Sequence, residues 1–237
     1  MSHRYKSENK IDFLSTYFCG LLTAKADKAW HINKLIRAVA VAARKGEQTI
    51  MPAKKYSTIL ADPPWDINQK GKRGAIMHYS LMTLEDIKNI PVADLAEENA
   101  HLWLWFPNGL MPEALGVLKA WGFTYRNYFT WIKPYLGLGN YLRNGSEALL
   151  FGTRGKAPVK FKGQQNWLFA PRQDHSHKPE EMYPIIERVS PGPYLELFAR
   201  RSQPNWDAWG NEIESDIIIP GYPVPEYSDK AKEREEV

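Results

Sequence analysis

The sequence predicts an α/β fold built on a mostly parallel, twisted sheet with helices on both faces. Strand-like apolar runs alternate with helix-like segments from residue 56 onward. A chain of 237 residues, 43% of them hydrophobic, can bury a full core without disulfides or a structural metal. The first strand ends in an acid, two prolines and an aromatic residue. Since ligands bind beyond the carboxyl ends of the strands in such sheets, we expect the functional site there.

The predicted elements follow from short apolar runs and from helix stop signals. The apolar runs predict strands over 56–61, 101–106, 127–133, 147–152 and 194–199. Helical spacing predicts a helix over 111–121 that ends at Gly122, and a second over 178–189 with Pro179 in its first turn. The polar or glycine-containing stretches 66–80, 134–146 and 155–177 are expected to be loops, and loops of this length are often functional.

The first fifty residues differ in character from the rest. Residues 1–50 carry nine Lys and Arg against four Asp and Glu, and apolar residues recur at helical spacing over 29–43. This amphipathic helix either docks on the main domain with a solvated basic face or contacts a nucleic-acid backbone. We therefore expect a basic helical extension over 1–50, a single catalytic domain over 51–219, and a Pro-rich, then charged, flexible tail over 220–237.

Composition narrows the class of protein. Cys19 is the single cysteine, so no internal disulfide can form, which fits a reducing, cytoplasmic compartment. The chain has no apolar run of membrane-spanning length and no secretion signal at its N-terminus, so we expect no membrane partner. A net charge of +4 with a pI near 8.9 permits a polyanionic partner without requiring one.

The motif Asp62-Pro63-Pro64-Trp65 follows the first predicted strand. Its prolines stiffen the loop. A carboxylate, rigid carbonyls and a ring at one sheet edge suit a flat molecule with an amino group, such as adenine. Asp62 would accept one N–H of the amine, the Pro63 carbonyl the other, and Trp65 would stack on the base. The competing interpretation is a surface turn with a chance aromatic residue.

Further motifs give the chain a resemblance to a known family. They are ADPPWDI (61–67), HYSLMTLEDI (78–87), LWLWFPN (102–108), WIK (131–133), RNGSEALLFGTRG (143–155), SHKPEEMYPIIERVSPG (176–192) and ELFARR…NWDAWGNE (196–212). In this order they resemble the adenine-N6 methyltransferases of the MT-A70 type over roughly residues 56–214. The resemblance implies a Rossmann-like methyltransferase fold with S-adenosylmethionine as methyl donor. The short spacing from ELFARR to NW is similar to the bacterial and phage branch, which implies a bacterial or phage-infected cell.

The resemblance also implies roles for residues near the substrate. Tyr79 would lie on a loop beside the target base, and Glu147 near the substrate adenosine. Arg143 and Asn144 belong to the same motif as Glu147, and we expect them to contact the substrate. Each has a structural alternative: Tyr79 as core packing, and Glu147 in a surface ion pair with Arg143 or Arg154.

For the donor, the resemblance implies contacts from both ends of the domain. Lys178 would lie near the donor carboxylate and the substrate, although a lysine at a helix start is also compatible with a solvated side chain. Glu196 either faces the donor or balances a nearby cation, because a buried acid needs a partner. The full expected donor set is Asp62, Lys178, Glu196, Arg200, Asn211 and Glu212.

The sequence departs from the pattern of the eukaryotic mRNA enzyme at two places. Glu212 stands where the eukaryotic mRNA enzyme has Gln, and Arg201-Ser202 replaces a His-Asn pair.

His175 and His177 lack a third ligand at a recognisable spacing, so no metal is expected. A dinucleotide dehydrogenase is disfavoured because no Gly-x-Gly-x-x-Gly follows the first strand.

The leading hypothesis is methyl transfer to the N6 amine of adenine in DNA, with RNA as the alternative polymer. Duplex DNA would require base flipping. Phosphate contacts are expected from basic loop residues, namely Lys70, Lys72, Arg73, Arg154, Lys156, Lys160 and Lys162. A catalytically silent nucleic-acid-binding subunit and a small-molecule or protein amine methylase are further alternatives. A homodimer or a partner subunit stays open.

Overall fold

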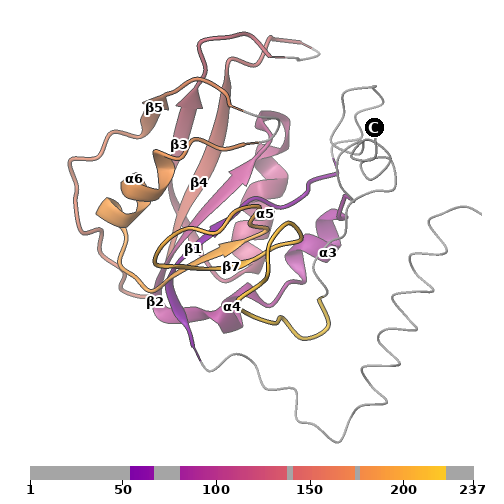
Figure 1. The fold of residues 1–237 in the computed structure, drawn as a ribbon, viewed down its shortest axis with the longest axis vertical. Coiled ribbons are helices and arrows are strands. Elements are labelled where there is room, and N and C mark those ends of the chain that lie inside the picture. Colours follow the sequence, from indigo (N-terminus) through magenta and orange to yellow (C-terminus); the bar gives the residue numbers. More distant parts are fainter. Residues whose placement is uncertain (1–53, 67–80, 138–140, 174–176, 223–237) are drawn as a thin grey trace, which may run out of the picture. The chain divides into compact units, whose positions relative to one another are not determined.

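The computed structural model describes residues 54–66, 81–137, 141–173 and 177–222 (Figure 1). The expected helix over 29–43, the loop with Lys70, Lys72 and Arg73, the side chain of Tyr79, and residues 223–237 lie outside the described residues. The domain bounds expected at residues 50 and 219 therefore stay predictions.

Seven strands and five short helical segments make up the described fold. In chain order they are β1 (Tyr56–Ala61), α3 (Leu84–Lys88), α4 (Val92–Leu95), β2 (Ala96–Phe106), the 3₁₀ turn η2 (Asn108–Leu110), α5 (Met111–Ala120), β3 (Thr124–Ile132), β4 (Ser146–Arg154), β5 (Trp167–Phe169), α6 (Met182–Val189), β6 (Tyr194–Leu197) and β7 (Trp206–Trp209).

The strands form one sheet in the order β5-β3-β4-β2-β1-β6-β7. Strand β1 pairs in parallel with both β2 and β6, and β6 pairs in parallel with β7. Strand β4 is antiparallel to β2 and β3, and β5 is parallel to β3. The sheet is therefore mixed but mostly parallel. From β1 the chain first builds outward through β2 and later returns to β6 on the other side, so a topological switch point lies between β1 and β6.

The sheet is covered by helices on both faces, as predicted. Leu102 and Leu104 of β2 point into a core shared with Val117 of α5. Trp103 and Trp105, which alternate with them, point into a second core shared with the apolar side of α6. The expected α/β fold class with a Rossmann-like sheet is confirmed.

Some element bounds differ from the prediction. Helix α6 begins at Met182 rather than at residue 178, and Met182 N–H bonds to the Pro179 carbonyl in a turn that precedes it. The strand predicted over 194–199 ends at Leu197, because Phe198 has a φ of 64° and leaves the extended conformation. Strand β5 lies inside the expected loop 155–177, and β7 was not predicted. These two strands have only three and four residues, which is too short for a period to be recognised.

Candidate active site

A pocket lies at the carboxyl ends of β1 and β6, where the switch point predicts a ligand site. Its empty volume is about 710 Å³ including the solvent-open mouth. The floor is formed by Leu60 of β1 and Trp105 of β2, and α6 contributes Met182 and Tyr183. Five of the residues predicted from the sequence line it: Asp62, Lys178, Glu196, Arg200 and Glu212.

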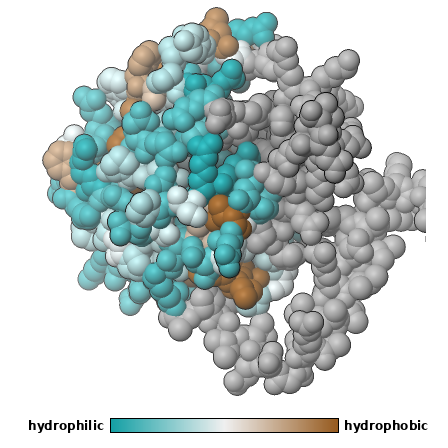
Figure 2. Space-filling model, viewed as in Figure 1, coloured by the Kyte–Doolittle hydropathy of each residue, from teal (hydrophilic) through white to brown (hydrophobic). Residues whose placement is uncertain are grey.

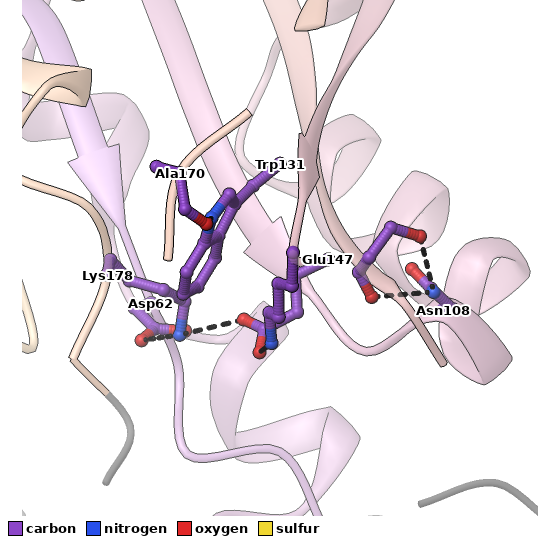
Figure 3. A network of polar contacts seen from close by, with 8 residues as sticks. Asp62, Asn108, Trp131, Glu147, Ala170 and Lys178 are labelled. Atoms are coloured by element: carbon purple, nitrogen blue, oxygen red, sulfur yellow. Dashed lines mark hydrogen bonds and ion pairs between the residues drawn. The ribbon is translucent and has the colours of Figure 1, made fainter. Parts of the chain in front are cut away.

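Lys178 links two acids from different strands (Figure 3). Its Nζ donates to Asp62 Oδ2 at 2.6 Å and lies 3.5 Å from Glu147 Oε2. The same ammonium group lies 5.2 Å from the centre of the Trp105 ring. Asp62 follows β1, Glu147 lies in β4, and Lys178 precedes α6. The structure therefore brings together three predicted residues that are far apart in the sequence, and Lys178 is not a solvated side chain.

Glu147 is also held by a second lysine, which sequence reasoning did not single out. Lys133, just after β3, forms an ion pair with Glu147 Oε1, and its ammonium group lies 4.4 Å from the centre of the Trp131 ring. Burial raises the pKa of Glu147, but the charges of Lys178 and Lys133 outweigh it, so that the pKa lies below its usual value. Glu147 is thus a carboxylate at neutral pH.

The sequence left open a surface ion pair of Glu147 with Arg143 or with Arg154, and the pairing with Arg154 is wrong. In the register of β2 with β4, Phe106 faces Ala148 at the site end, whereas Ala100 faces Arg154 at the other end. The two ends are separated by about 20 Å of strand. Arg154 donates instead to the Ala93 carbonyl.

Lys160, like Arg154, was expected to contact phosphate and binds a main-chain carbonyl at this far end of the sheet. Lys160 Nζ donates to the Glu187 carbonyl at 2.6 Å, and the Lys160 N–H bonds to the Val189 carbonyl at the end of α6. Arg154 and Lys160 therefore anchor the chain at the end of the sheet away from the pocket.

The Asp-Pro-Pro-Trp loop is fixed by backbone hydrogen bonds. The Asp62 N–H donates to the Leu197 carbonyl at 3.3 Å, which ties the loop to the end of β6. The Pro63 carbonyl accepts from the Trp65 N–H at 2.9 Å, and the Pro64 carbonyl accepts from the Met82 N–H at 2.9 Å. Each carbonyl has a second lone pair, so that of Pro63 keeps one for a ligand.

Trp65 does not have the open ring face that stacking on a base requires. It is 5% exposed and belongs to the core on the α5 side of the sheet, and its Nε1–H donates to the Trp105 carbonyl at 3.0 Å. Burial of the indole fixes the loop that carries Asp62. In this structure Trp65 is a positioning residue, which corrects the stacking role expected from the sequence.

Glu196 faces the pocket and is bound by a tyrosine rather than by a cation. Tyr183 donates its hydroxyl to Glu196 Oε2 at 2.9 Å. Burial raises the pKa of Glu196 to about 7, and the negative charge of Asp62 adds to the increase, although the Tyr183 hydrogen bond opposes it. Of the two alternatives for Glu196, the structure supports both in part: Glu196 lines the pocket, and the charge of Lys178 acts to lower its pKa, although its hydrogen-bond partner is Tyr183.

The other predicted residues fall into two groups. Arg200 and Glu212 both line the pocket, with Nε and Oε1 3.4 Å apart. The described residues that line the pocket do not include Asn211, Arg143 or Asn144. Arg143 and Asn144 are exposed in the connection between β3 and β4, where the Asn144 carbonyl accepts from the Gly137 N–H.

Several pocket residues were missed by sequence reasoning. His177, Glu180 and Arg201 form a polar rim, in which His177 Nε2 lies 2.6 Å from Glu180 Oε1 and Arg201 Nη1 lies 3.6 Å from it. Trp131 Nε1–H donates to the Ala170 carbonyl at 2.8 Å beside the site (Figure 3). The alternation of LWLWF could have indicated that Trp105 faces the site, and the lysine of WIK could have indicated Lys133 as a site residue. No group of three potential metal ligands occurs in the described ranges.

An α/β sheet with a pocket at its switch point, lined by acids and cations, defines a Rossmann-like fold with a candidate ligand site in the position usual for such sheets. Residues 56–212 match the MT-A70 family model. The chain belongs to the MT-A70 family.

Individual relatives differ in how much of their length is matched. The Type II methyltransferase M.MunI of Mycoplasma sp is 29% identical over 238 aligned residues, which cover 90% of this chain and 96% of that protein. The human N(6)-adenosine-methyltransferase catalytic subunit METTL3 is 31% identical over 174 residues, 68% of this chain and 28% of that protein. The MT-A70-like protein of Drosophila melanogaster is 31% identical over 177 residues, and the chain again spans 28% of its length. No helix in the described part of the chain is long and apolar enough to cross a membrane.

Proposed function

We propose that this protein transfers a methyl group from S-adenosylmethionine to the N6 amine of adenine in DNA. The observation that carries the proposal is the Asp62–Lys178–Glu147 network at the mouth of the pocket. The network sets the Asp62 carboxylate beside the ends of β1 and β6. A methyl donor inside the pocket and a target base outside it would both come within reach of Lys178. Membership of the MT-A70 family supports a methyltransferase.

The pocket suits the methyl donor in charge and shape. The donor carries a sulfonium cation, an amino-acid end, a ribose and an adenine, and supplies an electrophilic methyl group. Glu196 and Asp62 would face the cationic part, and Lys178 would hold the carboxylate. Arg200 and Glu212, on the far side of the pocket, would hold the ribose and the adenine. Asn211 would reach the ribose only after a change in its surroundings, because it does not line the pocket.

The residues around Asp62 address the poor nucleophilicity of an aromatic amine. Asp62 Oδ2 is held by Lys178, which leaves Oδ1 to accept one amine N–H. The Pro63 carbonyl would accept the other with its remaining lone pair. Two acceptors favour a pyramidal nitrogen with an available lone pair, and the rigid loop aligns that nitrogen with the donor methyl. Orientation of this kind supplies most of the rate acceleration. The N–CH3 bond would form as the S–CH3 bond of the sulfonium breaks, and the positively charged amine would then lose one proton to solvent, so that no strong base is needed.

DNA is the preferred polymer because of the extent of the match. M.MunI is matched over nearly its whole length, whereas METTL3 is matched over 28% of its own. RNA is the second candidate, since the eukaryotic relatives are named as adenosine methyltransferases. A cytoplasmic location and a homodimer or partner subunit stay predictions.

The test is transfer of labelled methyl groups to matched single- and double-stranded DNA and RNA. Wild type should label adenine-containing DNA, and Asp62→Ala should lose at least about 100-fold in rate, comparable to the loss of one transition-state hydrogen bond. The control Asp94→Ala removes an exposed acid of α4 and should leave the rate unchanged. Undiminished transfer by Asp62→Ala would refute the catalytic assignment, and a wild type that binds no donor in calorimetry would establish a silent subunit.

A further inference from the structure

One edge of the sheet leaves a row of apolar and aromatic side chains uncovered. On the α5 side of the sheet, Tyr125, Tyr128 and Ile132 of β3 are 42%, 43% and 38% exposed. Next to them on β5, Trp167 and Phe169 are 47% and 59% exposed. We call these five residues the β3–β5 face.

The strand register places these side chains on one surface. Thr130 pairs with Trp167 and Ile132 pairs with Phe169, so the two β5 rings continue the row set by β3. The alternate β3 residues, Phe129 and Trp131, point the other way into the core under α6. The row therefore continues the sheet surface that α5 covers over β2, β4 and part of β3, and the five side chains of the row stay exposed.

The β3–β5 face begins at the same end of the strands as the proposed active site, on the opposite face of the sheet from α6 and Trp131. Phe169 precedes Ala170, whose carbonyl accepts from Trp131 Nε1 at 2.8 Å (Figure 3). Ile132 precedes Lys133, the partner of Glu147. From there the row runs away from the site along β3 and β5, so a chain that enters the site across this sheet edge would pass over it.

The charge of this part of the molecule points to a polyanion. Residues 122–173 contain eight Lys and Arg and a single acid, Glu147, a formal charge of +7, whereas the whole chain carries +4. That one acid is neutralised by Lys133 and Lys178. Arg143 and Arg172, in the connections that follow β3 and β5, are exposed.

More exposed apolar side chains continue the row beyond β3. Tyr135 and Tyr141, in the connection to β4, are 71% and 100% exposed, and Leu136 and Leu142 are about as open. Figure 2 shows hydrophobic groups at the upper margin of the molecule, where Figure 1 places this connection. Basic residues interleaved with exposed aromatic rings are the features with which proteins hold unpaired bases: the cations attract phosphates, and the rings stack on bases of any sequence.

We propose that the β3–β5 face binds unpaired nucleotides next to the target adenine, with bases stacked on Trp167 and Phe169. This inference rests on the proposed function, since it assumes a nucleic-acid substrate. It adds that the substrate presents single-stranded nucleotides beside the site. A duplex has no free base faces to offer to the two rings.

The test uses an oligonucleotide that cannot occupy the active site. Binding of a fluorescent oligo-dT, which contains no adenine, is measured by anisotropy with wild type, with the double variant Trp167→Ala/Phe169→Ala, and with Phe161→Ala. Phe161 is a matched control, because it is a ring 46% exposed in the same basic segment, next to the Lys160 that bonds to the end of α6. We expect the double variant to lose at least about tenfold in affinity and the control to keep wild-type affinity.

Three further measurements separate this inference from its alternatives. Donor affinity of the double variant, measured by calorimetry, should equal that of wild type, which shows that the fold and the pocket are intact. A duplex of the same length should bind equally well to wild type and to the double variant. The Asp62→Ala variant should bind oligo-dT normally, whatever its methyl-transfer activity, so failure of the proposed function is seen separately.

Two outcomes would overturn the inference. Unchanged oligo-dT binding by the double variant, or an equal loss for duplex and single strand, would show that the two rings do not stack on unpaired bases. Self-association of wild type that the double variant abolishes, without any effect on oligo-dT binding, would identify the β3–β5 face as a protein interface.

Discussion

Replacing Glu196 by Gln should stabilise the protein at alkaline pH while leaving its stability at acidic pH nearly unchanged. Glu196 faces the pocket from β6, and burial raises its pKa to about 7 from an ordinary value of 4.5. Above pH 7 the folded protein must hold this carboxylate ionised in a partly buried position. Gln has the same shape without the charge, and its carbonyl oxygen can still accept from the Tyr183 hydroxyl.

The size of the effect follows from the two pKa values. Because the folded pKa is raised, the folded state binds more protons than the unfolded state between pH 4.5 and 7. The contribution of Glu196 to stability is therefore complete below about pH 4.5 and is lost as the pH rises through 7. The loss amounts to about 3 kcal/mol at pH 8. In a domain of this size it corresponds to a melting temperature about 6 to 12 °C higher for Glu196→Gln.

The assay is thermal or urea unfolding of wild type and Glu196→Gln at pH 5 and pH 8. The stabilisation at pH 8 minus that at pH 5 is the decisive quantity, because other titrating groups are common to both proteins. Glu214→Gln removes an exposed acid and serves as control, with no expected difference. If Glu196→Gln is no more stabilising at pH 8 than at pH 5, the reasoning about the buried charge is wrong.

Two further changes are informative. Lys178→Met removes the cation that holds Asp62 and Glu147 together. In steady-state kinetics it should lower kcat/KM for methyl transfer by at least about 100-fold, and calorimetry should show a near-normal melting temperature. Activity within threefold of wild type would contradict the role of Lys178. His101 is fully buried, and burial lowers its pKa, so its contribution to stability is present above about pH 6.5 and is lost as the pH falls below that value. The unfolding free energy of wild type should therefore decrease between pH 7 and pH 5 more steeply than that of His101→Asn. Parallel pH profiles of the two proteins would contradict this.

The sequence carried enough local information to predict the sheet and one side of the site. Strand β1 is bounded as predicted, because a short apolar run ending in Asp-Pro-Pro has few alternatives. Lys178 was identified through its motif, and the structure places it against Asp62. In these cases a few neighbouring residues define both the conformation and the chemistry.

The missed features depend on contacts between distant segments. Strands β5 and β7 are too short to show a period and exist because β3 and β6 offer free edges. Nothing near Trp65 in the sequence distinguishes a ring that stacks on a base from one buried in the core. The hydrogen bond from its Nε1–H to the Trp105 carbonyl, a distant residue, stabilises the buried position. Lys133 likewise becomes a site residue only through the pairing of β3 with β4, which sets it beside Glu147.

The place of β1 in the chain has a consequence for synthesis. Strand β1 is the first strand of the described residues, yet its partner β6 begins at Tyr194, more than 130 residues later. At translation rates of about 5–20 residues per second, the β6-facing edge of β1 stays open for roughly 7 to 27 seconds on the ribosome. That edge carries Ile59, Leu60 and Ala61, which are buried in the finished protein. During this interval the nascent chain presents an unpaired apolar strand edge of the kind that chaperones shield and that drives aggregation when it is left uncovered.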